Sequence, residues 1–394
     1  MEAMNEGAQE IPIPWYRHWL LGKNRYNRME LAGSFGDLGT LIPFVAGYIA
    51  VVGIDPLGIL FIFGISQLFA GFYFRTPMPV QSMKVIGGVA IASGGTISAG
   101  MIYGAGLFTG IFWFLVGFSK TITIFTGLAS KAIIRGIGLG LGLMFMADGV
   151  EKMLVTPWLG GSVLVLTFLL LARRRFPAMF AILFVGIIAA CFFDPVQAKR
   201  LLTIPPSFHL PEFSIARFHW DDLVKGSLLL AIPQIPLTLS NAVVAIRAEN
   251  NELFPKRPVS DRMLAVSQGI LNLFAWPFGG VPLCHGAGGM AGHVRFGAQT
   301  GGALVMLGGI MVALALFFSQ SVGLLFQIFP KAVLGVILFF AGSELAIYSK
   351  DIGSRKEDFY VMLVVAGFAW WNMGAAFLIG IILEQALKRG WVKL

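Results

Sequence analysis

The sequence predicts an all-α polytopic membrane protein with 14 transmembrane segments, arranged as an inverted repeat of seven plus seven. Three observations support this fold class: the composition, the one-sided distribution of basic residues, and motifs that recur at one offset. Of the 394 residues, 57% are hydrophobic and 12% are charged, whereas ordinary soluble domains carry about 25% charged residues. The chain has more apolar residues than a core surrounded by water can bury, so we expect a lipid bilayer around it.

The number of spans follows from the apolar stretches. A helix needs about 20 apolar residues to cross a bilayer, and fewer where it is broken inside the membrane. Prolines interrupt the chain just before the third and the tenth stretch, which predicts short extended pieces followed by half-helices. The predicted spans are 34–53, 56–74, 80–98, 101–118, 131–149, 157–172, 178–193, 223–245, 261–279, 283–295, 299–319, 330–347, 359–371 and 372–388.

The charges give the orientation of these spans. A net charge of +9 would indicate nucleic-acid binding in a soluble protein, but basic residues collect in the cytoplasmic loops of membrane proteins. With 1–29 as a cytoplasmic N-terminal segment, most of the 29 basic residues fall on the inner side. We therefore expect a multi-pass protein of the cell membrane with both termini in the cytoplasm, and no nucleic-acid partner.

The repeat is indicated by three pairs of motifs that are about 200 residues apart. The only long polar connection, 194–222, separates a first repeat, 30–193 with spans 1–7, from a second repeat, 223–394 with spans 8–14. Because each half has an odd number of spans, the second half enters the membrane from the opposite side. The motif pairs are DLGTLIPF with PQIPLTLSN, PVQSMKVIGGVA with PLCHGAGGMAG, and SKAIIRGIGLGLGLMF with PKAVLGVILFFAGSEL.

The broken spans predict an anion site. Pro77 and Pro79 cannot continue a helix, so the third half-helix is expected to start near Gln81 or Ser82, with Ser82 as its cap. The tenth is expected to start within LCHGAGG. Half-helix N-termini present free N–H groups and the positive ends of their dipoles. Two such ends facing one cavity would bind an anion, and Lys84 would add a full positive charge.

Other readings of these residues stay open. Lys84 is a ligand for the anion, a residue that extends to the membrane surface, or a partner of Asp37 or Glu344. His285 is a ligand contact or a polar residue satisfied within the fold. The alternating glycines of 136–142 indicate close helix packing, since no strand that a nucleotide-binding loop requires is predicted before them.

Further candidates lie on the first and eighth spans. Asp37 stands among glycines in GSFGDLGT and is a proton carrier, a lysine partner or a helix cap. On the eighth span, PQIPLTLSN supplies Gln234, Thr238 and Asn241. Gln234 lies between two prolines that free local carbonyl groups, so its amide is expected at the cavity; a simple proline kink is the alternative.

Several function classes are excluded at this stage. Cys191 and Cys284 both lie in apolar surroundings, and no spacing of metal ligands occurs. We expect no disulfide, metal site or cofactor. The N-terminal stretch lacks the pattern of a secretory signal peptide. No arrangement of nucleophile and base indicates an enzyme.

Four motifs together are similar to the molybdate transporter family, a branch of the SulP sulfate-permease superfamily. They are FGDLGTLIP, PMPVQSMK, PQIPLTLSNAVVA and CHGAGGMAGHVRFGAQTGG, and the resemblance extends from about Glu30 to the last span. The family usually has PVQPMK where this chain has Ser82 in place of the second proline.

The resemblance implies a fold like that of SulP proteins and uracil permeases, with a core domain of spans 1–4 and 8–11 and a gate domain of spans 5–7 and 12–14. It implies secondary active transport of molybdate by an elevator motion of the core against the gate. Protons are the predicted coupling ion because of the acid in GSFGDLGT, Asp37. Sulfate or other anion transport, or an anion channel, is the alternative. It further implies no STAS domain and a homodimer. The substrate-binding residues that it implies are Asp37, Thr40, Gln81, Ser82, Met83, Lys84, Gln234, Asn241, Cys284, His285, Gly286 and Ala287.

Overall fold

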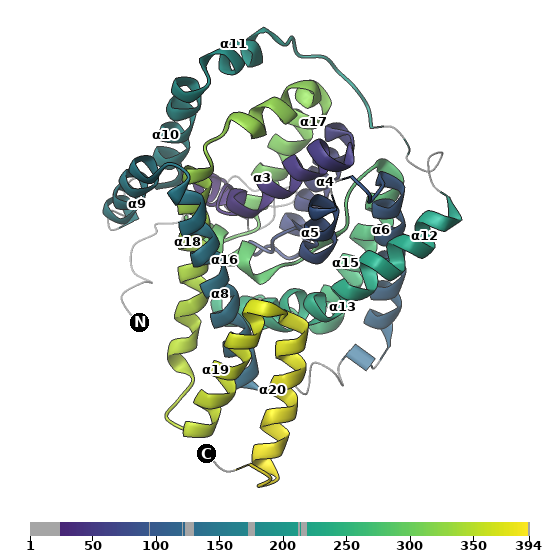
Figure 1. Ribbon diagram of the computed structural model, residues 1–394, viewed down its shortest axis with the longest axis vertical. Coiled ribbons are helices and arrows are strands. Elements are labelled where there is room, and N and C mark those ends of the chain that lie inside the picture. Colours follow the sequence, from purple (N-terminus) through teal and green to yellow (C-terminus); the bar gives the residue numbers. More distant parts are fainter. Residues whose placement is uncertain are drawn as a thin grey trace, which may run out of the picture.

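The computed structural model describes residues 24–93, 95–119, 121–122, 130–171, 178–211, 213 and 219–392. These residues form helices and a single pair of two-residue strands (Figure 1). The elements of the first half are α2 Arg28–Ser34, α3 Leu38–Gly47, η2 Tyr48–Val52, α4 Pro56–Tyr73, β1 Gln81–Ser82, α5 Lys84–Ala92, α6 Ala99–Phe118, α8 Lys131–Leu154, α9 Pro157–Leu171, α10 Ala178–Phe193 and α11 Pro195–Thr203.

The second half has the same succession of long helices around one short strand. Its elements are α12 Trp220–Gly226, η4 Ser227–Ala231, α13 Ile232–Leu239, η5 Ser240–Ala245, α14 Ile246–Leu253, α15 Asp261–Ala275, η6 Trp276–Phe278, β2 Leu283–Cys284, α16 Ala287–Arg295, α17 Gly302–Ile328, α18 Lys331–Ile347, η7 Tyr348–Asp351, α19 Lys356–Trp371 and α20 Met373–Lys388. Each of the predicted spans overlaps at least one of these helices, so the prediction of a helical multi-span chain is confirmed.

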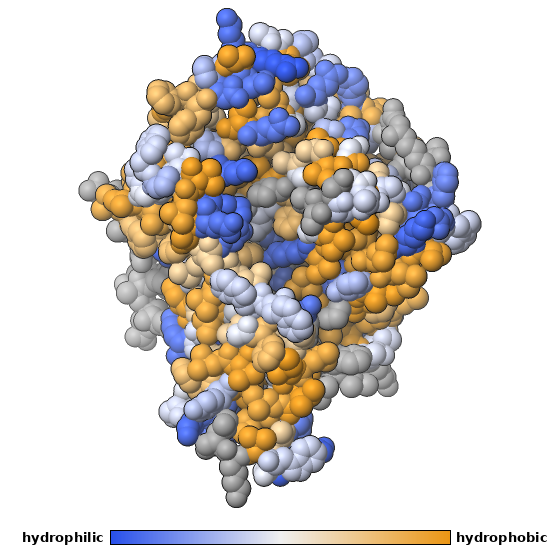
Figure 2. Space-filling view, in the orientation of Figure 1, coloured by the Kyte–Doolittle hydropathy of each residue, from blue (hydrophilic) through white to orange (hydrophobic). Residues whose placement is uncertain are grey.

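Length and apolarity test how many helices can cross a bilayer unaided. Among the described residues, five helices pass this test, and up to seven pass if each of two bent pairs counts as one span. Apolar side chains cover much of the face in Figure 2, while polar side chains gather over α11 at the top. Large apolar residues that are exposed include Trp158, Phe168, Phe184, Trp371 and Ile382. Lipid is the solvent that such a surface requires.

Several long helices begin where short polar side chains cap them. Ser98, Ser130 and Ser260 each accept a hydrogen bond from the backbone N–H three residues later, at the starts of α6, α8 and α15. Asp55 accepts from Leu57 N, and the proline that follows Asp55 occupies the first turn of α4. These caps satisfy N–H groups that have no acceptor inside the helix.

The start predicted for the third half-helix was wrong. Gln81 and Ser82 form strand β1, and α5 begins at Lys84 after Met83, whose backbone is extended and whose side chain makes no cap. The physical reason is strand pairing: β1 pairs antiparallel with β2, which keeps this segment extended. In the second half, α16 begins at Ala287, within the predicted LCHGAGG stretch.

Two further details differ from the simple spans predicted from the sequence. The first span is interrupted around Phe35–Asp37, between α2 and α3. The connection 194–222, predicted as a loop, contains helix α11, which bends 106° away from α10. Asp194 caps α11 and the proline after it opens the helix, so this connection carries its own helix-start signal.

Glycines set the spacing of the main helix pairs. Any Cβ at Gly142 would lie 2.6 Å from Gly342 O, and any Cβ at Gly149 would lie 2.7 Å from Gly335 O. Helix α8 therefore packs backbone to backbone on α18. A Cβ at Gly136 would lie 2.7 Å from Met362 O of α19. The prediction that the glycines of 136–142 serve close helix packing is therefore confirmed at Gly136 and Gly142.

Candidate functional site

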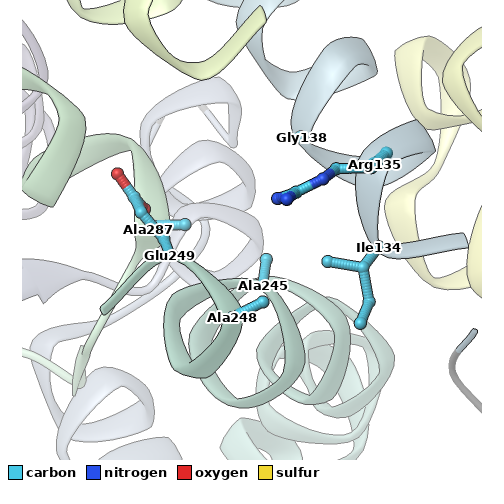
Figure 3. A pocket seen from close by; sticks show the side chains of 7 residues that line it. All are labelled: Ile134, Arg135, Gly138, Ala245, Ala248, Glu249 and Ala287. Atoms are coloured by element: carbon cyan, nitrogen blue, oxygen red, sulfur yellow. The ribbon is translucent and has the colours of Figure 1, made fainter. Parts of the chain in front are cut away.

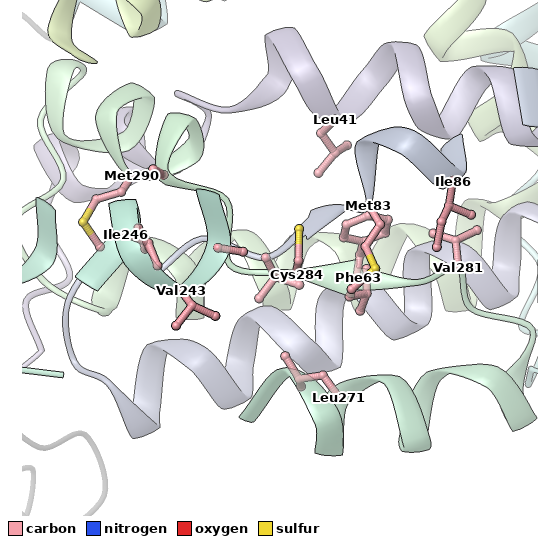
Figure 4. Close-up of a cluster of buried hydrophobic side chains, with 14 of the residues drawn as sticks. Leu41, Phe63, Met83, Ile86, Val243, Ile246, Leu271, Val281, Cys284 and Met290 are labelled. Carbon is pink, nitrogen blue, oxygen red and sulfur yellow. The ribbon is translucent and has the colours of Figure 1, made fainter. Parts of the chain in front are cut away.

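Two short strands, β1 and β2, pair antiparallel and position the two half-helices that follow them. This paired segment is called the crossing below. In β1 and β2, Gln81 pairs with Cys284 and Ser82 pairs with Leu283. Beyond the pair, Met83 N donates to Pro282 O over 2.9 Å. Figure 4 shows Met83 and Cys284 close to this crossing, with apolar side chains from the surrounding helices packed around it. The predicted meeting of two interrupted spans is thus present in the structure.

Buried polar side chains hold the extended backbone of this crossing. The His285 ring bonds Pro79 O through Nδ1 at 2.8 Å and Ser267 Oγ through Nε2 at 2.9 Å. The Asn272 amide donates to Leu283 O and accepts from Leu283 N, at 2.7 and 2.8 Å. Non-helical backbone at membrane depth needs such partners. Both ring nitrogens of His285 are therefore engaged by the protein, which places this residue as a support of the strands.

A carboxylate lies directly beside β1. Gln81 Nε2 donates to both carboxylate oxygens of Asp37, at 2.7 and 2.8 Å. The Thr40 hydroxyl also donates to the Asp37 carboxylate. Asp37 and Gln81 are 3% and 4% exposed. Three of the predicted site residues thus form a single hydrogen-bonded cluster: Asp37 at the break in the first span, Thr40 in the first turn of α3, and Gln81 of the third span.

Two glycines of the second half bring backbone against this cluster. A Cβ at Gly286 would overlap Gln81 Oε1 and would lie 3.3 Å from Asn241 Nδ2. A Cβ at Gly289 would lie 2.9 Å from Gln81 Nε2 and 3.0 Å from Asp37 Oδ2. At both positions only glycine leaves the cluster undisturbed. The glycines of the CHGAGG motif are therefore required by close approach between the two halves.

The Lys84 ammonium is the unsatisfied charge of the site. Its Nζ is buried and makes no hydrogen bond within the part of the chain that the structure describes. It lies 4.4 Å from the centre of the Phe145 ring of α8, at the distance of a cation–π contact. A direct hydrogen bond to Asp37 is not formed in the described structure. An ammonium held in this way keeps its donors free for an anion.

The eighth span contributes to the same place. Gln234 Oε1 accepts from Val85 N of α5 at 2.7 Å, and Gln234 Nε2 donates to Thr238 Oγ1 at 2.9 Å. Gln234 therefore caps the first turn of the third half-helix. Asn241 is buried, and its Oδ1 has no hydrogen-bond partner among the described residues.

Free backbone donors remain at both helix tips. Helices leave the N–H groups of their first turn without an internal acceptor. The backbone N–H of Val85 donates to Gln234, whereas the backbone N–H groups of Lys84 and Ile86 have no acceptor among the described residues. At the start of α16 the same holds for Ala287 and Gly288, within the described chain. The two tips thus offer N–H groups and positive dipole ends to the crossing.

A cavity of about 610 Å³ leads to this position. Thr40 and Lys84 form its wall on the side of α3 and α5, and Phe145 and Asp148 on the side of α8. It is large enough for a small hydrated ion. The complete lining is Gly39, Thr40, Phe44, Lys84, Met144, Phe145, Ala147, Asp148, Glu151, Lys152, Leu338 and Trp370.

The structure brings the predicted residues of four spans together around β1 and β2. Ser82 Oγ bonds the Tyr48 hydroxyl at 3.2 Å, Met83 is fully buried, and Cys284 lies opposite Gln81. Tyr48 and Phe145 were not predicted from the sequence as residues of the site. Tyr48 had no motif to mark it, whereas Phe145 ends the repeated glycine-rich segment SKAIIRGIGLGLGLMF. Among the described residues no group of three or more His, Cys, Asp or Glu could hold a metal ion.

The family model described as "Molybdate transporter of MFS superfamily" matches residues 29–145 and 226–345, which is more than half of the chain. The chain belongs to this molybdate transporter family. Molybdate transporter 2 of Arabidopsis thaliana is 34% identical over 95% of this chain and 90% of its own length. Molybdate transporter 1 of the same plant is 30% identical over 91% and 88%.

Solved structures show the same fold at low sequence identity. The transmembrane domain of the cyanobacterial bicarbonate transporter BicA is 15% identical, with a TM-score of 0.57 over 90% of this chain and 98% of that domain. The murine Solute Carrier 26 family member A9, an anion transporter in the inward-facing state, is 14% identical, with a TM-score of 0.61 over 100% of this chain and 75% of that one. The molybdate transporter family member described here therefore has the membrane fold of SulP-type transporters, as its motifs implied.

Proposed function

We propose that this protein is a secondary active transporter that carries molybdate across the cell membrane and binds it between the N-terminal ends of α5 and α16. The single observation that supports this most is the β1–β2 pair, which brings the two half-helix starts together, with the unpaired Lys84 ammonium at the α5 tip lining the large cavity. Membership of the molybdate transporter family supports the choice of substrate.

The chemistry of the site suits a tetrahedral dianion. Removing a doubly charged oxyanion from water is costly, so the site must supply positive potential and hydrogen-bond donors. Two helix ends provide roughly half a positive charge each, and Lys84 provides a whole one. Free N–H groups from both tips would contact different oxygens of the anion, with Gln234 and Gln81 fixing the geometry of the tips and of Asp37.

The arrangement of the helices supports fourteen spans in an inverted repeat. Helix α4 packs on α17, and α15 packs on α6. Helices α4 and α17 are spans 2 and 11. Exchanging the two repeats turns this pair into spans 9 and 4, which are α15 and α6. The pair α8 and α18, spans 5 and 12, converts into itself. Such exchange symmetry is expected of two repeats related by a twofold axis in the membrane plane.

In this proposal spans 1–4 and 8–11 form a core that moves against a gate of spans 5–7 and 12–14, in an elevator motion. The cavity lies between the two, with α3 and α5 on the core side and α8, α18 and α19 on the gate side. With the N-terminus in the cytoplasm, this cavity occupies the outer half of the membrane. A core that carries both helix tips would move the bound anion with it.

Asp37 is the proposed carrier of the coupling proton. It is a buried carboxylate in the hydrogen-bonded cluster next to the helix tips, with Gln81 as donor to both of its oxygens. Protonating it would break one of these contacts and remove a negative charge from the neighbourhood of the anion. Proton uptake at Asp37 and anion binding would therefore favour each other, which is the requirement for symport.

The test is uptake of radiolabelled molybdate into proteoliposomes, with sulfate, tungstate and uracil as competitors. We expect accumulation against a gradient, inhibition by tungstate, and no inhibition by uracil. Sulfate has the same shape and charge, so stronger inhibition by sulfate than by unlabelled molybdate would reassign the protein as a sulfate transporter. Uptake that only equilibrates the two sides would support the alternative, an anion channel, and contradict secondary active transport.

A further inference from the structure

Two cavities lie at opposite ends of helix α8. The large cavity is lined by the C-terminal half of α8, including Phe145 and Asp148. The second cavity, of about 20 Å³, is lined by the N-terminal half of α8 at Arg135. These two regions are about 20 Å apart along the helix axis, at 1.5 Å per residue. The site is thus reached through a wide opening on one side and is nearly closed on the other.

The small cavity lies against the N-terminal end of α16. Figure 3 shows Arg135 from α8, Ala245 and Ala248 from the η5–α14 segment, and Ala287 at the start of α16 around the small cavity. Ala287 carries one of the free N–H groups of the proposed anion site. The small cavity is therefore where an exit from the tips toward the N-terminal end of α8 would have to open, and a space of this size holds about one water molecule.

An ion pair spans this closed side. Arg135 Nη2 lies 2.5 Å from Glu252 Oε2 of α14. The Arg135 side chain is 10% exposed, whereas the Glu252 side chain is 41% exposed. Arg135 lines the small cavity, and Glu252 is the more exposed partner of the pair. The pair joins α8, in the proposed gate domain, to α14, in the proposed core domain.

Two other ion pairs each lie within one of the proposed domains. Lys152 and Asp148 lie one turn apart on α8, and Arg247 pairs over 2.6 Å with Asp261 between α14 and α15, two core helices. These pairs are kept when the core moves as a unit. The contact of Arg135 with Glu252 must break, because a core that slides along α8 carries Glu252 away from Arg135.

We propose that Arg135 and Glu252 form the gate that closes the anion site on the side of the N-terminal end of α8. This proposal rests on the core and gate assignment of the proposed function and adds the residues that hold the closed state. A charge-assisted hydrogen bond made in one state alone favours that state by about a factor of ten. Removing it shifts the protein toward the state that is open on this side.

The test measures access to the small cavity without any substrate. A cysteine is introduced by Ala248→Cys in a chain with Cys191→Ser, and a charged methanethiosulfonate reagent is applied from either side of oriented vesicles. The same chain without Ala248→Cys gives the background rate from Cys284. We expect slow modification with the native pair, and modification about tenfold faster from the cytoplasmic side with Arg135→Gln or Glu252→Gln.

Two controls distinguish loss of the Arg135–Glu252 contact from a general loosening of the helix packing around Ala248. The exchanged pair, Arg135→Glu with Glu252→Arg, is expected to return the slow rate. Arg247→Gln removes an ion pair of similar length from the same helix α14 and is expected to leave the rate unchanged. Equal rates in the native chain and both single variants would overturn the proposal, and so would a fast rate in the exchanged pair.

The result is independent of the substrate. If the single variants show faster modification while no molybdate uptake is measured in proteoliposomes, the gate stands and the assignment of molybdate fails. If uptake proceeds and the modification rates are equal, the gate fails alone. The exposed position of Glu252 makes Glu252→Gln the variant that disturbs folding least, since an exposed glutamine replaces a carboxylate of the same shape.

Discussion

Replacing Gly286 by alanine tests the close approach between the two halves of the site. The backbone at Gly286, with φ of −76° and ψ of 127°, is one that alanine adopts readily, so the substitution carries no backbone strain. The new Cβ would overlap Gln81 Oε1, far inside ordinary contact distance. The Gln81 amide must then move, and it is the amide that donates to both oxygens of Asp37.

The size of the effect follows from these two hydrogen bonds. Hydrogen bonds to a charged group are worth about 1.5–3 kcal/mol each. A displacement of roughly 1 Å removes the equivalent of one such bond, so holding the native arrangement costs about 1.5–3 kcal/mol more than before. The fraction of molecules with a competent site then falls, and the apparent dissociation constant for molybdate rises by about 10- to 150-fold.

The assay is the concentration dependence of radiolabelled molybdate uptake into proteoliposomes, together with the melting temperature of the purified protein in detergent. Gly88→Ala on α5 is the matched control, because a Cβ there meets nothing within 4 Å. It is expected to keep the wild-type Michaelis constant. Adding Gln81→Ala to Gly286→Ala is expected to raise the Michaelis constant little further, because both changes act on the same Gln81 amide. An unchanged Michaelis constant in a well-folded Gly286→Ala protein would refute this reasoning.

Three further predictions concern single groups of the site. Lys84→Ala is expected to raise the Michaelis constant for molybdate at least 100-fold while the protein still inserts, because the whole positive charge is lost; an unchanged constant in proteoliposome uptake would contradict a binding role. Asp37→Asn is expected to remove the stimulation of uptake by an inward proton gradient, and stimulation that persists would assign coupling elsewhere. Asn272→Ala leaves the buried N–H and C=O of Leu283 unsatisfied, which costs about 2–4 kcal/mol; a lower melting temperature with full surface expression would confirm it, and an unchanged one would contradict it.

The sequence predicted where the two interrupted spans of the candidate site meet because the signal for each interruption is local. Pro77 and Pro79 interrupt the third span wherever the chain folds, and the prolines and glycines before Cys284 do the same for the tenth. Because each repeat has seven spans, an odd number, the third and tenth spans run in opposite directions, and their breaks approach the same region from opposite sides. Lys84, next to the first break, followed as the charge of the site.

The remaining details depend on contacts between distant segments. The half-helix start shifted from Gln81 to Lys84 because β1 pairs with β2, which is about 200 residues away. Gln234 was expected at the cavity, but its role as the cap of Val85 requires the eighth span to lie against α5. The pairing of Arg135 with Glu252 links segments more than 100 residues apart and leaves no pattern in either of them.

The position of the bound ion tests the central proposal most directly. Anomalous scattering from molybdenum, measured on crystals grown with molybdate, locates the ion without reference to any variant. We predict one peak between the ends of α5 and α16, within hydrogen-bond reach of N–H groups of Lys84 or Ile86 on one side and of Ala287 or Gly288 on the other. A peak elsewhere in the protein, with this position filled by water or side chains, would contradict it.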